Sequence, residues 1–246
     1  MKKILVLLSL VFVCTNLTAQ TGKDIIQSCI TSMRLDKLDS VMTVSAKAYL
    51  YQQSQKTTIR YFNKDYGDGT SENSDSKIRI ELSSMGKEDA FVIADDEFFR
   101  VVPNYEELDP ANMGQLQQLM GWMFPTFSII SIVKDTVDAA IFTLQEGTTK
   151  FNDKNCKKIS IASKEKPEEI IQYIFFDEST NWFQGVEIPT EQGIIGLTCS
   201  SFKKAKGHVY PTTIKLLNDG KKLLEVEIDK LEFDISLEDS LFERKK

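Results

Sequence analysis

The sequence predicts a mainly β protein with some α-helix: an incomplete antiparallel β-barrel, or half-barrel, of about eleven strands. An N-terminal helix and a central helical lid are expected to cover it. The first observation behind this prediction is a run of strand-like segments from residue 169 to 235, with no gap long enough for a crossover helix, so that neighbouring strands must be antiparallel. Apolar and polar residues also alternate earlier in the chain, which is typical of strands with one buried face. Two segments with helical spacing of apolar residues are the third observation behind the prediction.

Residues 1–19 have the pattern of a secretory signal peptide. Two lysines precede an apolar run at 4–13, and Leu17-Thr18-Ala19 resembles a cleavage site. The run, about ten residues long, is too short for a bilayer-spanning helix, which needs about 20. Cys14 raises lipid anchoring as an alternative, but the bulky residues before it favour cleavage. We therefore expect residues 20–246 to form a single exported domain.

The composition is that of an ordinary globular domain, with 41% hydrophobic and 27% charged residues. The chain is acidic, and removing the two signal-peptide lysines lowers the formal net charge from −6 to −8. An acidic chain without a basic, aromatic-rich patch is poorly suited to nucleic acid or to an anionic membrane surface. We therefore expect no nucleic acid among its partners.

Three cysteines follow the signal peptide: Cys29, Cys156 and Cys199. An odd number excludes a fully paired disulfide framework. Cys29 lies on a helical apolar stripe and is expected in the core. A bridge between Cys156 and Cys199, both on expected strands, remains open as an alternative. No CxxC motif occurs, so the sequence supports neither a zinc nor a redox site.

The chain has one histidine, His208, in a turn that leads into a strand. Any Ser-His-Asp or Cys-His site would have to use it, but the chain contains no GxSxG or HExxH motif. We expect a solvated turn residue rather than a catalytic group. The sequence therefore predicts no enzyme, no catalytic residue, no metal site and no cofactor.

The first expected element of the mature chain is a helix at Gly22–Met33, because apolar residues recur there at helical spacing. Thr21 is suited to the N-cap, with Asp24 three residues later as a variant of the capping box. A helix with one apolar stripe must cover an apolar surface. We expect it to lie on the sheet.

Strands are expected next at 41–50, 57–62 and 76–83, followed by a hairpin of 90–94 with 97–102. In the first strand Met42, Val44 and Leu50 share the apolar face, and in the third Ile78 and Ile80 do so. The opposite face is expected to be wet. The polar, acidic stretch 63–76 is expected to be a long hairpin loop rather than a calcium site, because the alternating ligands and the closing glutamate are missing.

A methionine-rich helix is expected in the middle of the chain, from Asp109 as cap and Pro110 at its first position through Met123. Two interpretations remain open: a helix packed on the sheet, or an adaptable apolar lid, since methionine conforms to irregular partners. One helix can do both. Strands are expected to resume at 128–133, 140–145 and 155–162.

The last strand region, 222–235, changes its inward-facing positions from even to odd numbers. Because side chains alternate with a period of two, this change requires an extra residue, which we expect near Asp229 and Lys230. The resulting bulge would bend the strand. A short turn at 240–242 is expected to follow.

Four stretches carry a family resemblance: 173–182, 185–187, 198–203 and 207–212. The first is a strand that ends in Asp177 before a turn, and the last is a Gly-His-Val-Tyr-Pro element that opens a later strand. This pattern resembles the periplasmic outer-membrane lipoprotein carriers, the LolA-like family. The resemblance implies a half-open barrel capped by helices, with an apolar cavity that shields lipoprotein acyl chains.

The resemblance further implies a monomeric periplasmic carrier that delivers lipoproteins or other lipids to the outer membrane, between an inner-membrane donor and an outer-membrane acceptor. The chain departs from the family in its acidic loop and its greater length. The family's lid-closing arginine is not assigned among Arg60, Arg79 and Arg100, all on expected strands. The alternative is a non-transporting envelope scaffold or sensor with a filled interior. Candidate lipid-binding residues of the cavity or lid are Met42, Val44, Leu50, Ile78, Ile80, Met113, Met120, Trp122, Met123, Phe124 and Phe127.

Overall fold

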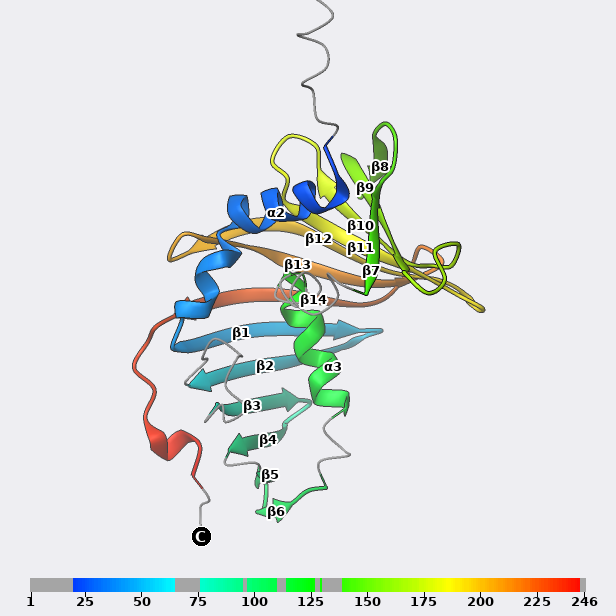
Figure 1. The fold of residues 1–246 in the computed structure, drawn as a ribbon. Helices are drawn as coiled ribbons and strands as arrows, with labels where there is room; N and C mark the ends of the chain where they lie inside the picture. Colours follow the sequence, from blue (N-terminus) through cyan, green and yellow to red (C-terminus); the bar gives the residue numbers. More distant parts are fainter. Residues whose placement is uncertain are drawn as a thin grey trace, which may run out of the picture.

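A computed structural model of the chain describes residues 20–64, 76–94, 97–109, 114–126, 129 and 139–243 (Figure 1). Its helices are α2 (Gly22–Met33) and α3 (Gly114–Met123), with the 3-10 turns η1 (Leu35–Ser40) and η3 (Asp239–Leu241). Its strands are β1 (Thr43–Gln52), β2 (Gln55–Lys64), β3 (Lys77–Ser84), β4 (Lys87–Ala94), β5 (Glu97–Val102), β6 (Glu106–Glu107), β7 (Ala140–Leu144), β8 (Thr149–Phe151), β9 (Lys154–Ser163), β10 (Ile170–Asp177), β11 (Phe183–Thr190), β12 (Gly193–Ala205), β13 (His208–Asn218) and β14 (Lys221–Phe233).

All fourteen strands belong to one antiparallel sheet, in the order β6-β5-β4-β3-β2-β1-β14-β13-β12-β11-β10-β9-β7, with β8 beside β9. The two ends of this order do not pair with each other within the described residues, so the sheet stays open. The expected incomplete antiparallel barrel is therefore confirmed. The described residues form fourteen strands rather than about eleven. Two of the additional strands, β6 and β8, have only two and three residues and are too short to show an alternating pattern.

The predicted bulge lies at Asp229. In the pairing of β1 with β14, Lys47 is opposite Lys230 while the next residue, Ala48, is opposite Ile228. Asp229 is thus the extra residue on β14, and its carboxylate lies 3.0 Å from the Lys47 ammonium. The bulge keeps apolar side chains on one face along the whole of β14, as the period-two argument requires.

The N-terminal helix has the predicted bounds and the predicted cap. The Thr21 hydroxyl accepts from the Asp24 backbone N–H at 3.2 Å, and the Asp24 carboxylate accepts from the Thr21 backbone N–H at 2.8 Å. This reciprocal pair satisfies two backbone donors at the start of α2. The hydrogen bond from the Thr21 backbone N–H to the Asp24 carboxylate, together with one from the Thr21 hydroxyl at 2.7 Å, lowers the pKa of Asp24.

Replacing Thr21 with alanine is expected to lower the free energy of unfolding by about 1 kcal/mol, because the cap hydroxyl is lost. Ser28→Ala is the matched control, since Ser28 is on the same helix and its hydroxyl donates only to a backbone carbonyl one turn earlier. Urea denaturation followed by circular dichroism measures both. Equal stability of the two variants would contradict a stabilising role for the cap.

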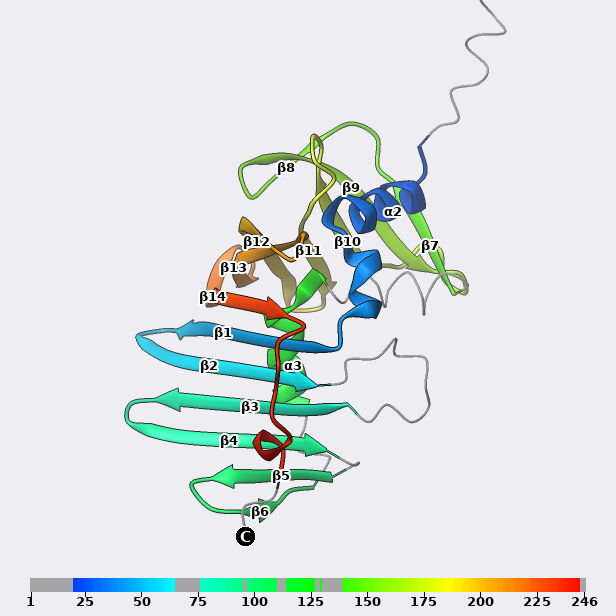
Figure 2. The same cartoon turned by 90° about the vertical axis from the view of Figure 1, so that its left-hand side faces the viewer.

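The sheet has two different faces. We call the face that carries Val44, Ala46 and Ala48 the inner face, and the opposite one the outer face. Figures 1 and 2 show α2 and α3 on the inner side of the sheet. The start of α2 lies so close to β7 that a Cβ at Gly22 would come within 2.9 Å of the Phe142 carbonyl oxygen. The main hydrophobic core is therefore enclosed by the inner face and the two helices.

The outer face of β2–β5 is not fully wet, contrary to expectation. Residues 237–242 run across it in Figure 2, on the side opposite α3, and their side chains cover Val92, Ala94 and Phe99. This cover comes from residues more than 130 positions away in the sequence. Local alternation therefore gave no sign of it. The turn expected at 240–242 is confirmed as η3.

Several predictions fall on residues that the structure does not describe: the signal peptide 1–19 with Cys14, positions 65–75 of the acidic loop, and the expected strand at 128–133 except Ile129. Ile129 has helical rather than extended backbone. No helix among the described residues is long and apolar enough to cross a membrane.

Candidate functional site

The central helix α3 crosses the inner face from the level of β4 toward β13, as Figure 1 shows. Leu116, Leu119 and Met123 form its buried stripe. Phe124, just after the helix, places its ring 5.1 Å from that of Tyr61 on β2. The predicted helix over the sheet is thus present, although its start at 110–113 lies outside the described residues. Whether α3 moves as a lid is a separate question of dynamics.

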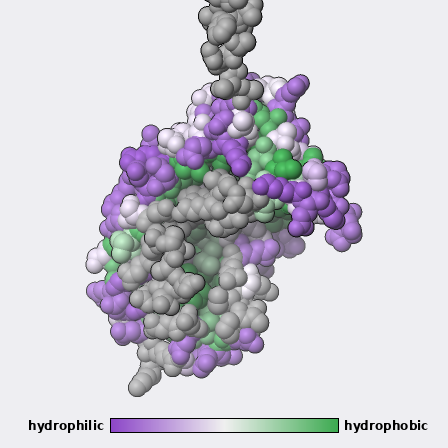
Figure 3. Space-filling view, viewed as in Figure 1, coloured by the Kyte–Doolittle hydropathy of each residue, from purple (hydrophilic) through white to green (hydrophobic). Residues whose placement is uncertain are grey.

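Beside α3, the inner face of β3 and β4 carries apolar side chains that are incompletely covered. Ile80 is 1% exposed, whereas its neighbours on the same face are only half-buried. We call these neighbours the β3–β4 patch: Ile78, Leu82, Phe91 and Ile93. Figure 3, which views the side that carries α3, shows hydrophobic surface in the same half of the molecule. The patch is thus a group of adjoining apolar side chains that keep part of their surface accessible.

The side chains of α3 continue this half-buried surface. Met120 and Trp122 both pack against the core while remaining partly accessible. Met123 and Phe124, by contrast, are buried. The helix therefore has one buried stripe, flanked on its two sides by Met120 and Trp122, whose apolar atoms still meet solvent.

The strand candidates from the sequence divide in a similar way. Val44 and Ile80 are buried, while Leu50 and Ile78 are half-buried. Met42 is 56% exposed, so its assignment to the cavity is wrong. The reason is that β1 begins at Thr43, so Met42 lies just before the strand. Its backbone N–H donates to the Asp234 carboxylate. Met113 and Phe127 lie outside the described residues.

Three residues of the patch were absent from the sequence candidates: Leu82, Phe91 and Ile93. Leu82 shares the alternation of Ile78 and Ile80, and Phe91 and Ile93 continue it on the next strand. The signal was therefore present in the sequence. What the alternation did not contain is the degree of burial, which depends on how much of each strand α3 covers.

The half of the inner face beneath α2 is filled by the chain's own side chains. Ile25, Cys29 and Met33 of α2 are completely buried, as are Ile174 and Phe176 of β10. The Met33 sulfur even accepts from the Phe183 backbone N–H at 3.4 Å. Native packing density leaves no room for a ligand in such a region. Any binding surface on the inner face therefore lies toward β3 and β4.

A charged group borders the patch on β5, the next strand after β4 in the sheet. The register places Arg100 opposite Phe91, on the inner face, where its guanidinium pairs with Glu106 and lies 4.0 Å from Asp89. Its Nε is buried without a hydrogen-bond partner. Of the three arginines considered from the sequence, Arg100 is therefore the one on the inner face.

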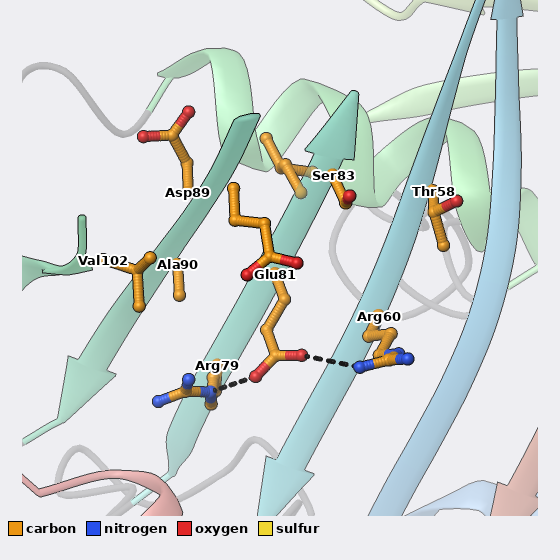
Figure 4. A pocket seen from close by; sticks show the side chains of 10 residues that line it. Thr58, Arg60, Arg79, Glu81, Ser83, Asp89, Ala90 and Val102 are labelled. Atoms are coloured by element: carbon orange, nitrogen blue, oxygen red, sulfur yellow. Dashed lines mark hydrogen bonds and ion pairs between the residues drawn. The ribbon is translucent and has the colours of Figure 1, made fainter. Parts of the chain in front are cut away.

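The other two arginines line a pocket on the outer face (Figure 4). The Glu81 carboxylate accepts from Arg79 Nε at 2.8 Å and lies 3.6 Å from Arg60 Nη1. Thr58, Ala90 and Val102 contribute to the rest of a cavity of about 390 Å³. Nothing in the sequence indicated this pocket, because its residues come together only through the pairing of β2, β3 and β4.

His208 is buried rather than solvated, which corrects the sequence prediction. Its Nδ1 lies 2.8 Å from the Arg34 carbonyl oxygen, and its ring packs edge-on against Phe233 at 5.0 Å. The reason is that β13 begins at His208 itself, and the turn after α2 lies against it. The side chain thus ties the first helix to the sheet.

The three cysteines that the structure describes are free and buried, so Cys156 and Cys199 do not form a bridge. Burial raises the pKa of Cys29 to about 12 and that of Cys156 to about 11, and it raises the pKa of Cys199 well above its ordinary value. Thiols in this state are poor nucleophiles and poor metal ligands. Within the described ranges, no three His, Cys, Asp or Glu side chains are grouped to hold a metal ion.

Comparison with known proteins shows likeness at the level of the fold. No family model matches the chain, and no curated protein matches its sequence. Among solved structures, a DUF1329 family protein from Desulfovibrio piger is similar with a TM-score of 0.51 and 14% identity, over 92% of this chain and 98% of that one. This likeness shows that the two proteins share a fold.

Two further solved structures are similar at lower scores. A LolA superfamily protein from Nitrosomonas europaea has a TM-score of 0.49 and 12% identity, over 92% of this chain and 98% of that one. The MucA/MucB complex of Pseudomonas aeruginosa gives 0.36 and 11%, over 89% of this chain and 60% of that one.

Proposed function

We propose that this chain is a non-catalytic, monomeric carrier that binds acyl chains of lipoproteins or other lipids on the inner face beside α3. In this proposal it acts in the periplasm, after export by its signal peptide, and delivers lipid toward the outer membrane. The observation that carries the proposal is the β3–β4 patch, a set of apolar side chains left half-buried next to a helix that is itself partly accessible. Soluble proteins seldom leave such a surface without a ligand or partner.

A partly covered surface suits a carrier better than a deep cavity. Burying one methylene group is worth about 0.8 kcal/mol, so a fully buried 16-carbon chain would gain roughly 12 kcal/mol before binding costs. Two or three chains would then exceed the practical ceiling of about 18–21 kcal/mol and would not be released. A shallow patch limits this gain. A carrier that must both extract and release its cargo needs that limit.

A binding role rather than an enzymatic one is supported by the state of the reactive side chains. The one histidine is buried and bonded to a backbone carbonyl, and the described cysteines are buried thiols. None of them lies in the β3–β4 patch. The proposal therefore assigns the inner face to binding alone.

Introducing charge or removing apolar area on α3 is expected to weaken lipid binding. Met120→Asp and Trp122→Ser each place a polar group at a half-buried position of the helix, and we expect at least a tenfold rise in the Kd for a fluorescent fatty-acyl probe. Gln118→Ala, at an exposed position of the same helix, is the matched control and should leave binding unchanged. Unchanged probe binding in both α3 variants would refute the assignment of α3.

A second candidate function follows from the filled half beneath α2. If the rest of the inner face is closed in the same way, the fold acts as an envelope scaffold or sensor through protein contacts. Native mass spectrometry of protein purified from its own envelope separates the two. Retained lipid, released by mild heating and absent from the Met120→Asp variant, supports the carrier. A clean apo mass supports the scaffold.

A further inference from the structure

The outer face of β2–β5 carries a second apolar surface, distinct from the inner face. Val92, Ala94 and Phe99 are buried there beneath residues 237–242, which we call the C-terminal strap, with Phe62 and Val101 packed beside them. This small cluster has its own members and is separate from the main core. The strap can therefore leave its surface without opening the interior of the protein.

Two side chains and one carbonyl hold the strap. Phe242 is 3% exposed and inserts into the apolar cluster. Three residues earlier, the Asp239 carboxylate accepts from Lys64 Nζ at 2.8 Å and lies 3.9 Å from Lys77 Nζ. Between them, the Leu241 carbonyl oxygen accepts from Arg79 Nη1 at 2.9 Å. An aromatic anchor with a nearby cationic rim is the pattern of a peptide-binding site.

The surface is larger than the strap that covers it. A cavity of about 210 Å³ remains beside Phe242, between Ala94 and Phe99 on one side and Asp239 on the other. On the far side of Arg79 lies the pocket of Figure 4, where the same guanidinium donates to Glu81. A volume of this size holds several water molecules, each of which occupies about 30 Å³ in the liquid. The strap thus leaves part of the outer face unfilled. We call the surface under the strap, together with the cavity beside Phe242, the outer groove.

We propose that this outer groove is a docking site for a peptide segment of a partner protein that carries an acidic residue and, three residues later, an aromatic one. The strap is the site's internal ligand and blocks it in the isolated chain. The partner's acid takes the place of Asp239 between Lys64 and Lys77, and its aromatic ring takes the place of Phe242. The site is independent of lipid binding, because it lies on the opposite face of the sheet.

The tethered strap makes a strong competitor. A segment joined to its site by a short linker has an effective concentration in the millimolar range, so a free peptide must compete against it. The wild-type chain is therefore expected to bind a strap-like peptide weakly. Opening the strap should reveal the affinity of the site.

The experiment uses the full chain with D239K and F242D together, which remove the anchor and set a lysine against Lys64 and Lys77. A fluorescein-labelled peptide of residues 236–243 is titrated and followed by anisotropy. We expect the double variant to bind it at least tenfold more tightly than the wild type does. Ser240→Ala, an exposed strap position, is the matched control and should behave as wild type.

Charge reversal tests the recognition itself. Adding Lys64→Glu and Lys77→Glu to the double variant should weaken the wild-type peptide at least tenfold, and the D239K peptide should recover binding. Circular dichroism checks the fold, and D239K alone, at an exposed position, replaces the double variant if that variant does not fold. It should then show a smaller gain of the same sign.

Three outcomes would overturn the proposal. One is a folded, opened variant that binds the peptide no more tightly than wild type does. Another is binding that is indifferent to the charge reversal. The third is a concentration-dependent dimer of the wild type that F242D abolishes, which would assign the groove to the strap of a second copy.

Discussion

Replacing Gly185 with alanine is expected to lower the free energy of unfolding by more than about 3 kcal/mol. Gly185 has a φ of +148°, which L-residues rarely adopt. A Cβ added there would lie 2.0 Å from the Leu197 carbonyl oxygen and 2.9 Å from a ring carbon of Phe151. Leu197 belongs to the paired strand β12, so the added Cβ clashes with a backbone atom and no rotamer change relieves it.

Gly220→Ala separates the conformational cost of a positive φ from the cost of the steric clash. Gly220 also has a positive φ, +75°, but no atom lies within 4 Å of the position its Cβ would take. Only the conformational cost remains, about 1–2 kcal/mol. Urea denaturation of both variants gives the comparison, and equal losses of stability would show that the β11–β12 contact yields more easily than its geometry implies.

The fold was predictable where the signal is local. Helical spacing and a capping pair define α2 to the residue, and a change in alternation locates the bulge at Asp229. Contacts between distant segments were not predictable in this way. His208 looked like a turn residue because its burial comes from the Arg34 carbonyl, which is far away in the sequence. The strap over the outer face was not predicted, because it too depends on a contact between segments far apart in the sequence.

The candidate site shows the same division. Alternation identified Ile78 and Ile80 as inward-facing, and composition identified α3 as an apolar helix. Ile80 is buried and Ile78 is only half-buried, and this difference depends on where α3 crosses the strands. Met42 lies outside this alternation because the strand begins at Thr43, and the Met42 backbone N–H donates instead to the carboxylate of distant Asp234. Sequence periodicity predicts which face of the sheet a side chain is on, whereas tertiary contacts determine how far it is buried.

Replacing Asp177 with alanine is expected to cost about 2 kcal/mol of stability, because its carboxylate organises the turn between β10 and β11. One oxygen accepts from the Ser179 hydroxyl at 2.6 Å, the Ser179 N–H at 3.0 Å and the Thr180 N–H at 2.9 Å. The other accepts from Lys154 Nζ at 3.2 Å. This turn also belongs to one of the four stretches that carry the family resemblance.

The same hydrogen bonds make the contribution of Asp177 depend on pH. Burial alone would raise the pKa of Asp177, but the bonds from Ser179, Thr180 and Lys154 outweigh it and hold the pKa well below its ordinary value near 4. The folded state therefore binds the proton less readily than the unfolded chain does. The stabilisation is complete above the ordinary pKa and is lost as the pH falls through the lowered folded value.

Asp177→Asn removes the ionisation while keeping the size of the side chain. The stability difference between wild type and this variant should be largest near pH 7 and should shrink steadily as the pH falls below about 4. Glu178→Gln, at the exposed neighbouring position, should change stability by less than about 0.5 kcal/mol at every pH. Denaturation midpoints from pH 7 down to pH 3 provide the measurement. A difference that stays constant over this range would mean that the turn depends on the shape of the side chain and not on its charge.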